Sequence, residues 1–145
     1  MSERTNTASE TPERIRVLYV APMEKPKLIT IDHTLEKLQE LVGGYIDVMY
    51  PWPSDEVGLI VNDEGKMDGS MPNRCLEDYD VIFGSFIVSG LTEDNFGSIS
   101  DEMAEKYSAK FAHPEMFLKS ADDKVMCIKI GSRELPRIVW NGTSE

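Results

Sequence analysis

Apolar residues recur in short blocks along the chain, and their spacing predicts more strands than helices. Apolar and polar side chains alternate at 14–22 and 45–50, which is the pattern of a half-buried strand. Residues 57–61 and 80–89 are almost wholly apolar, as is typical of strands buried on both faces. We therefore expect 80–89 to form the central strand, with Gly84 marking a bulge or a close packing contact.

Two segments have the spacing and the end signals of helices. Residues 35–42 follow a capping residue, Asp32 or Thr34, and stop at Gly43, a residue that favours the left-handed conformation at a helix C-terminus. Residues 101–111 form the second predicted helix, and its first turns hold acidic residues where the helix dipole favours them.

Turn residues separate the other predicted strands. A turn at 23–27 joins the first strand to a returning strand at 28–31, so the chain opens with a hairpin. Residues 62–65 have the composition of a turn, with Gly65 at a position that needs positive φ. A late edge strand is expected at 124–130. The sequence therefore predicts an α+β fold, a mainly antiparallel sheet of about five to six strands with two principal helices.

One globular domain accounts for most of the chain. A length of 145 residues is enough to bury a sizeable core and matches a single domain. Residues 1–13 are rich in Ser, Thr and Glu and are expected to form a flexible N-terminal tail. We place the domain at 14–131 and treat 132–145 as a C-terminal tail.

Acidic residues are concentrated in one part of the chain. Residues 54–105 contain 13 of the 26 Asp and Glu residues but only two of the 15 Lys and Arg residues, Lys66 and Arg74. The whole formal charge of −11 therefore comes from this span. Such a distribution favours a basic partner and argues against direct binding of nucleic acid.

The remaining composition indicates a cytoplasmic protein without a membrane partner. No apolar run approaches the roughly 20 residues of a membrane span, and the N-terminus has no secretory signal. Cys75 and Cys127 lie far apart in sequence and are expected to be reduced thiols. A zinc site made from these cysteines with His33 and His113 lacks any paired spacing, so we expect no metal and no cofactor.

Four short motifs between residues 35 and 90 give the chain a resemblance to a known domain family. The motifs are 38–46 (Leu-Gln-Glu-Leu-Val-Gly-Gly-Tyr-Ile), 62–66 (Asn-Asp-Glu-Gly-Lys), 72–74 (Pro-Asn-Arg) and 80–86 (Asp-Val-Ile-Phe-Gly-Ser-Phe). They resemble a small, acidic domain family of unknown function found in bacteria, phages and mobile elements. The resemblance implies no established chemistry, and it raises the expectation of an accessory or anti-defence role.

Arg74 is the sharpest single candidate for ligand binding. Its guanidinium fork could hold a phosphate or carboxylate, with the Asn73 amide beside it. The alternative, which we favour, is that Arg74 pairs with a local carboxylate such as Asp78 or Asp80 and staples its loop.

Three further residues could complete a small-ligand site. Asn62 could fix a polar group, while Tyr50 and Trp52 could pack against a flat one. The two aromatic residues are also typical of half-buried lids over a core, which is the interpretation we favour. The sequence offers no acid–base pair, nucleophile or phosphate-binding loop in a recognisable pattern, and we therefore expect no enzyme.

The sequence thus predicts a non-enzymatic acidic binding protein. We expect a phage or mobile-element accessory protein, with anti-defence as one form, that blocks a basic site on a host macromolecule such as a basic host protein. The alternative is a small-ligand binding or sequestering protein that uses an Arg74/Asn73 pocket. The oligomeric state is left open. The residues expected to meet a basic partner are Glu77, Asp78, Glu93, Asp94, Asp101 and Glu102.

Overall fold

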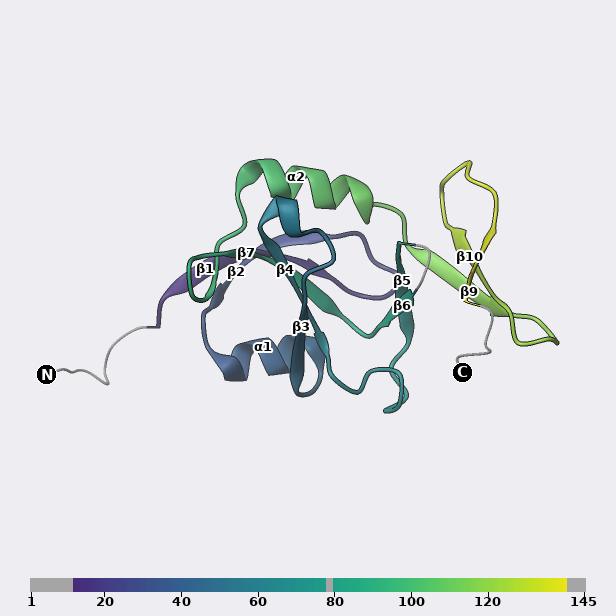
Figure 1. The fold of residues 1–145 in the computed structure, drawn as a ribbon, viewed down its shortest axis with the longest axis horizontal. Coiled ribbons are helices and arrows are strands. Elements are labelled where there is room, and N and C mark those ends of the chain that lie inside the picture. Colours follow the sequence, from purple (N-terminus) through teal and green to yellow (C-terminus); the bar gives the residue numbers. More distant parts are fainter. Residues whose placement is uncertain (1–11, 78–79, 141–145) are drawn as a thin grey trace, which may run out of the picture.

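A six-stranded antiparallel sheet forms the centre of the molecule, with one helix on each of its faces (Figure 1). Figure 1 shows the computed structural model, which describes residues 12–77 and 80–140. Most of the segment expected as an N-terminal tail lies outside these ranges. The strand order is β2-β1-β7-β4-β3, with β8 beside β7. The six strands are β1 (Arg14–Val20), β2 (Lys27–Asp32), β3 (Ile46–Met49), β4 (Val57–Asn62), β7 (Phe86–Leu91) and β8 (Phe96–Gly97).

Side chains of successive strand residues point to opposite faces of this sheet and form two cores. In β7, Phe86 and Val88 pack with residues of α2 (Asp101–Lys110), whereas Ile87 packs with residues of α1 (Leu35–Val42). All three β7 side chains are completely buried. The central sheet is therefore covered on both faces.

Both helices begin where the sequence predicts, and α1 also ends there, whereas α2 ends at Lys110, one residue before the predicted end. The Thr34 hydroxyl accepts a hydrogen bond from the Lys37 amide, and Ser100 does the same for the Met103 amide. Gly43 ends α1 with a φ of 87°, the left-handed conformation expected of glycine there. The opening hairpin of β1 and β2 is also confirmed.

Two smaller sheets lie beside the central sheet. A hairpin of β5 (Pro72–Leu76) and β6 (Asp80–Phe83) forms one. The other contains β9 (Glu115–Lys119), β10 (Val125–Lys129) and β11 (Arg137–Trp140), in the order β11-β10-β9. Elsewhere in the chain, a short 3-10 helix, η1, covers Pro53–Asp55. With two α-helices and antiparallel pairing throughout the described strands, the α+β fold is confirmed.

The prediction of one central strand at 80–89 is wrong. The segment is divided at Gly84, whose φ of 83° is incompatible with a continuous strand. Residues before it belong to β6 and pair with β5, while those after it form β7 between β1 and β4. The glycine therefore marks a change of sheet, and only the β7 half pairs with β4.

Two predictions near the turns also need correction. Gly65 does not have positive φ. Glycine is needed there for lack of space, because an added Cβ would lie 2.7 Å from the Phe83 carbonyl oxygen. The late strand at 124–130 is not an edge strand, since β10 pairs with β9 on one side and β11 on the other. The strand β11 falls within 132–145, the segment expected to form a C-terminal tail.

No helix within the described residues is long and apolar enough to cross a membrane.

Candidate functional site

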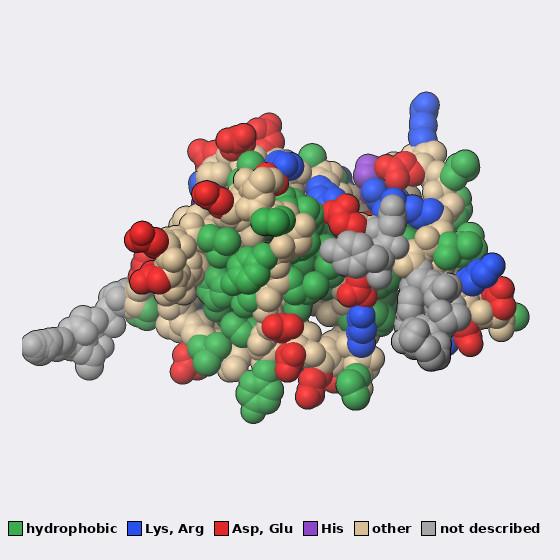
Figure 2. Space-filling view, in the orientation of Figure 1, with side chains coloured by type: hydrophobic (Ala, Val, Ile, Leu, Met, Phe, Trp, Pro, Cys, Tyr) green, Lys and Arg blue, Asp and Glu red, His purple; other side chains and the backbone are tan. Residues whose placement is uncertain are grey.

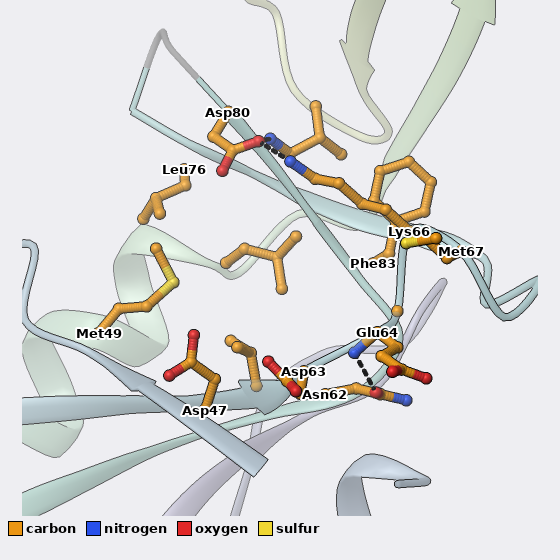
Figure 3. A pocket seen from close by; sticks show the side chains of 14 residues that line it. Asp47, Met49, Asn62, Asp63, Glu64, Lys66, Met67, Leu76, Asp80 and Phe83 are labelled. Carbon is orange, nitrogen blue, oxygen red and sulfur yellow. Dashed lines mark hydrogen bonds and ion pairs between the residues drawn. The ribbon is translucent and has the colours of Figure 1, made fainter. Parts of the chain in front are cut away.

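A hollow of about 370 Å³ lies between the β3–β4 edge of the central sheet and the β5–β6 hairpin (Figure 3). Its floor is apolar, and carboxylates surround its mouth. We call this site the acidic hollow. Its floor residues are Met49, Val61, Leu76, Ile82 and Phe83, and its charged residues are Asp47, Asp63, Glu64, Lys66 and Asp80.

Strand alternation explains how an acidic and an apolar side chain of β3 come to line the same site. Ile46 and Val48 pack into the core on the α1 side of the sheet. Asp47 and Met49 must therefore point to the opposite face, where the acidic hollow lies. The neighbouring strand β4 contributes Val61 from the same face.

The charged groups of the acidic hollow do not cancel. Lys66 forms an ion pair of 2.5 Å with Asp80 on one side (Figure 3). Asp47 and Asp63 lie on the other side and, like Glu64, make no ion pair within residues 12–77 and 80–140. Four carboxylates and one ammonium group leave three negative charges around an apolar floor.

The turn that carries this rim is held by its own side chains. The Asn62 amide nitrogen donates to the Val42 carbonyl and to Asp68, and its oxygen accepts from the Glu64 amide at 2.9 Å. Hydrogen bonds from the Ser70 hydroxyl and amide hold the pKa of Asp68 below its ordinary value. Asn62 therefore lines the hollow mainly as a structural residue.

Arg74 and Asn73 are completely buried, and their polar atoms already have partners. The Arg74 guanidinium donates to the Phe111 carbonyl at 2.9 and 3.2 Å and to the Glu24 carbonyl at 2.6 Å. It also donates to the Asn73 side-chain oxygen at 2.8 Å. Arg74 thus holds loops together, as the favoured interpretation expected. Its partners are mainly carbonyl oxygens rather than Asp80. The other carboxylate considered, Asp78, lies outside the described residues.

Asn73 joins segments in the same way. Its amide nitrogen donates to the carbonyls of Val20 and Gly84, at 3.0 and 2.9 Å. The pKa of Arg74 is lowered by burial and held up in part by the nearby charge of Glu115. In the small-ligand interpretation, the side chains of Arg74 and Asn73 would have to bind a ligand. Their hydrogen-bonding groups are instead occupied by the hydrogen bonds described above.

The two aromatic candidates lie apart from the acidic hollow. Trp52 packs its ring 4.6 Å from that of Tyr107 and donates to Glu77 at 2.7 Å, so it is a half-buried lid on the core. Tyr50 is 54% exposed and lines a different hollow, beside Glu93 and Asp94. The sequence candidates for ligand binding are therefore distributed over several places.

The predicted acidic contact residues also divide between paired and exposed positions. Glu77 accepts hydrogen bonds from Trp52 and Lys110, which lower its pKa. Asp101 pairs with Arg16 at the start of α2. Glu102 is exposed beside it, as are Glu93 and Asp94 in their turn. Figure 2 shows apolar side chains gathered in the middle of one face, with acidic side chains around them.

The cysteines and histidines do not form the four-residue set considered from the sequence. Cys75 and Cys127 lie together and are joined by Glu115. His33 instead lies near Glu13, and the His113 ring nitrogen is 3.1 Å from the Ile130 carbonyl oxygen.

Comparison with protein families matches residues 15–112 to the domain of unknown function DUF3846. The chain belongs to this family. The DUF3846 domain extends from β1 to just beyond α2, so it contains the whole acidic hollow but not β9, β10 or β11. The resemblance to a domain family of unknown function is confirmed at that level. No curated protein and no solved structure matches the chain.

The acidic hollow was not predicted, although part of its signal is in the sequence. The alternation at 46–49 places Asp47 and Met49 on one face of a strand. What joins them to Asp80 and Phe83 is the pairing of β6 with β5 rather than with the central sheet. That change of partner depends on the backbone at Gly84.

Proposed function

We propose that this protein is a non-enzymatic binding protein whose acidic hollow receives a lysine or arginine side chain of a basic protein. One observation carries the proposal, namely an apolar floor of five residues beneath a rim with three uncompensated negative charges. An apolar floor alone would suit any hydrophobic group. The charged rim selects a group that is both cationic and apolar.

Lysine and arginine side chains have this mixed character. Their aliphatic stems cover apolar surface while the charged end stays near water or carboxylates. In the acidic hollow the stem would lie over the floor residues Met49, Leu76 and Phe83. The charged end would then reach Asp47 and Asp63, which have no cationic partner of their own among the described residues.

The charge of the whole chain supports the same class of partner. A formal charge of −11 attracts basic surfaces over a longer range than one contact and raises the association rate. A protein that covers a basic site with carboxylates competes with anything else that needs the site, including nucleic acid. We propose such competitive blocking as the mechanism.

The biological setting is part of the proposal as well. Competitive blocking of a host protein suits an accessory protein of a phage or mobile element, with anti-defence as one form, acting in the cytoplasm. The resemblance of the sequence motifs to proteins from such sources supports this setting. Direct binding of nucleic acid is not part of it, because the carboxylates repel phosphates.

Chemical-shift mapping with a short arginine-rich peptide tests where a basic ligand binds. We expect the largest amide shifts in β3, the 62–67 turn and β6, because these segments carry the acidic hollow. Shifts centred on the first turn of α2, where Asp101 and Glu102 lie, would contradict the assignment of the site and leave only general charge attraction.

A further inference from the structure

Three side chains of types that commonly bind metal ions are buried together where the DUF3846 domain meets the three-stranded sheet. Cys75 lies on β5, Glu115 begins β9 and Cys127 lies in the middle of β10. Their exposed fractions are 5%, 3% and 2%, and their ligand atoms lie within 4.8 Å of one another. We propose that this cluster binds a thiophilic divalent metal ion, with zinc as the ion it fits best.

The distances within the cluster are close to those of a metal site. The Cys127 sulfur lies 3.0 Å from Glu115 Oε1, which also accepts from the Cys75 amide at 2.7 Å. A tetrahedral zinc ion with ordinary bond lengths holds its ligands roughly 3.5–3.8 Å apart. The ligand atoms, all within 4.8 Å of one another, would have to adjust to this spacing when an ion binds.

The ligand types decide which metal is suited. Two thiolates and one carboxylate form a set that zinc prefers, whereas magnesium and calcium prefer oxygen ligands alone. The cluster opens on one side to a polar hollow of about 290 Å³, which Cys75 and Glu115 line together with Lys129 and Glu134. A water molecule from this hollow would complete the fourth position.

The charges balance around such a site. Binding breaks two S–H bonds, releases both protons to solvent and forms two metal–sulfur bonds and one metal–oxygen bond. Two thiolates and a carboxylate around a dication leave one negative charge. The completely buried guanidinium of Arg74, the residue next to Cys75 in β5, would supply the opposite charge.

A purely structural role for the same residues makes a different prediction. In that case Glu115 serves only as the acceptor for the Cys75 amide and the Cys127 thiol. Cys127→Ser keeps a donor of similar size at this position but removes the thiolate. It therefore separates metal binding from hydrogen bonding.

The experiment titrates the reduced, chelator-treated full chain with zinc, measured by calorimetry, and with cobalt, measured by its thiolate charge-transfer absorption. We expect one ion per chain and a higher unfolding temperature with zinc. Cys127→Ser and Glu115→Gln are each expected to weaken zinc binding by at least about 100-fold, because even residues outside the ligand set affect affinity by 10–100-fold. Circular dichroism checks that each variant is folded.

Glu134→Gln is the matched control, because it removes a carboxylate from the same polar hollow without touching the cluster. We expect its zinc affinity to equal that of the original chain. The proposal is overturned if the original chain shows no one-to-one binding and no cobalt–thiolate absorption. It is also overturned if a folded Cys127→Ser variant binds zinc as tightly as the original chain. These results are independent of the acidic hollow.

Discussion

Arg74 shows at the scale of one residue how a cation in an acidic chain can serve the fold instead of a ligand. Its guanidinium is completely buried and joins the loop at Glu24 to the end of α2 at Phe111. The sequence indicated that Arg74 was unusual, because it is one of two cations in a long acidic span. It could not show that the partners are backbone carbonyls, because these carry no sequence signal.

Replacing Arg74 by Met should strongly destabilise the fold. The variant leaves the Phe111 carbonyl without its donor and removes the cation that offsets Glu115. We expect a loss of about 3–5 kcal/mol in the free energy of unfolding, measured with urea. Arg133→Met changes an exposed arginine and should remain within about 0.5 kcal/mol. A loss below about 1 kcal/mol for Arg74→Met would show that the buried guanidinium is dispensable.

Asp55 provides a pH prediction at the same scale. Hydrogen bonds from Lys106 and Tyr107 lower the pKa of Asp55 below its ordinary value. A carboxyl with a lowered folded pKa contributes stability above its unfolded pKa of about 3.9, and this contribution is lost as pH falls through the folded pKa. Asp55→Asn should therefore reduce the loss of stability below about pH 4. Urea unfolding at several pH values measures this difference. An unchanged pH profile would contradict this role.

At the scale of elements, local signals located most strands but not their partners. Both helices, the opening hairpin and β4 could be predicted because caps, turns and apolar spacing act over a few residues. The strand β5 was missed because two of its buried residues, Asn73 and Arg74, are polar. The pairing of β6 with β5 depends on contacts between whole hairpins, which the apolar run alone did not reveal.

Gly84→Ala tests the division of the apolar run at 80–89. Because Gly84 has a φ of 83°, an alanine there should cost about 1–2 kcal/mol of stability. The added Cβ would meet the Ser70 side chain at an ordinary distance of 3.4 Å, so backbone strain dominates the cost. A continuous strand would instead gain stability from alanine, since glycine weakens strand interiors. Equal or higher stability in thermal unfolding would therefore favour the continuous strand.

At the scale of the whole molecule, charge could be read from the sequence but its placement could not. The sequence gives the span 54–105 that carries the net charge, yet Asp47 of the acidic hollow lies outside that span. Several acids within it, including Asp55 and Glu77, are paired with lysines of α2. The fold therefore selects which carboxylates remain available for a basic partner.

The most direct test of the acidic hollow compares two charge-matched variants. For each variant, calorimetry measures the affinity for the same arginine-rich peptide. The first variant, Asp47→Asn with Asp63→Asn, removes two carboxylates from the hollow. The second, Glu102→Gln with Glu105→Gln, removes two exposed carboxylates from α2 and leaves the same net charge. We expect the first variant to lose at least about tenfold in affinity, equivalent to about 1.4 kcal/mol, and the second to lose less than about threefold. Equal losses in the two variants would contradict a specific site and reduce the acidic hollow to one part of a general negative field.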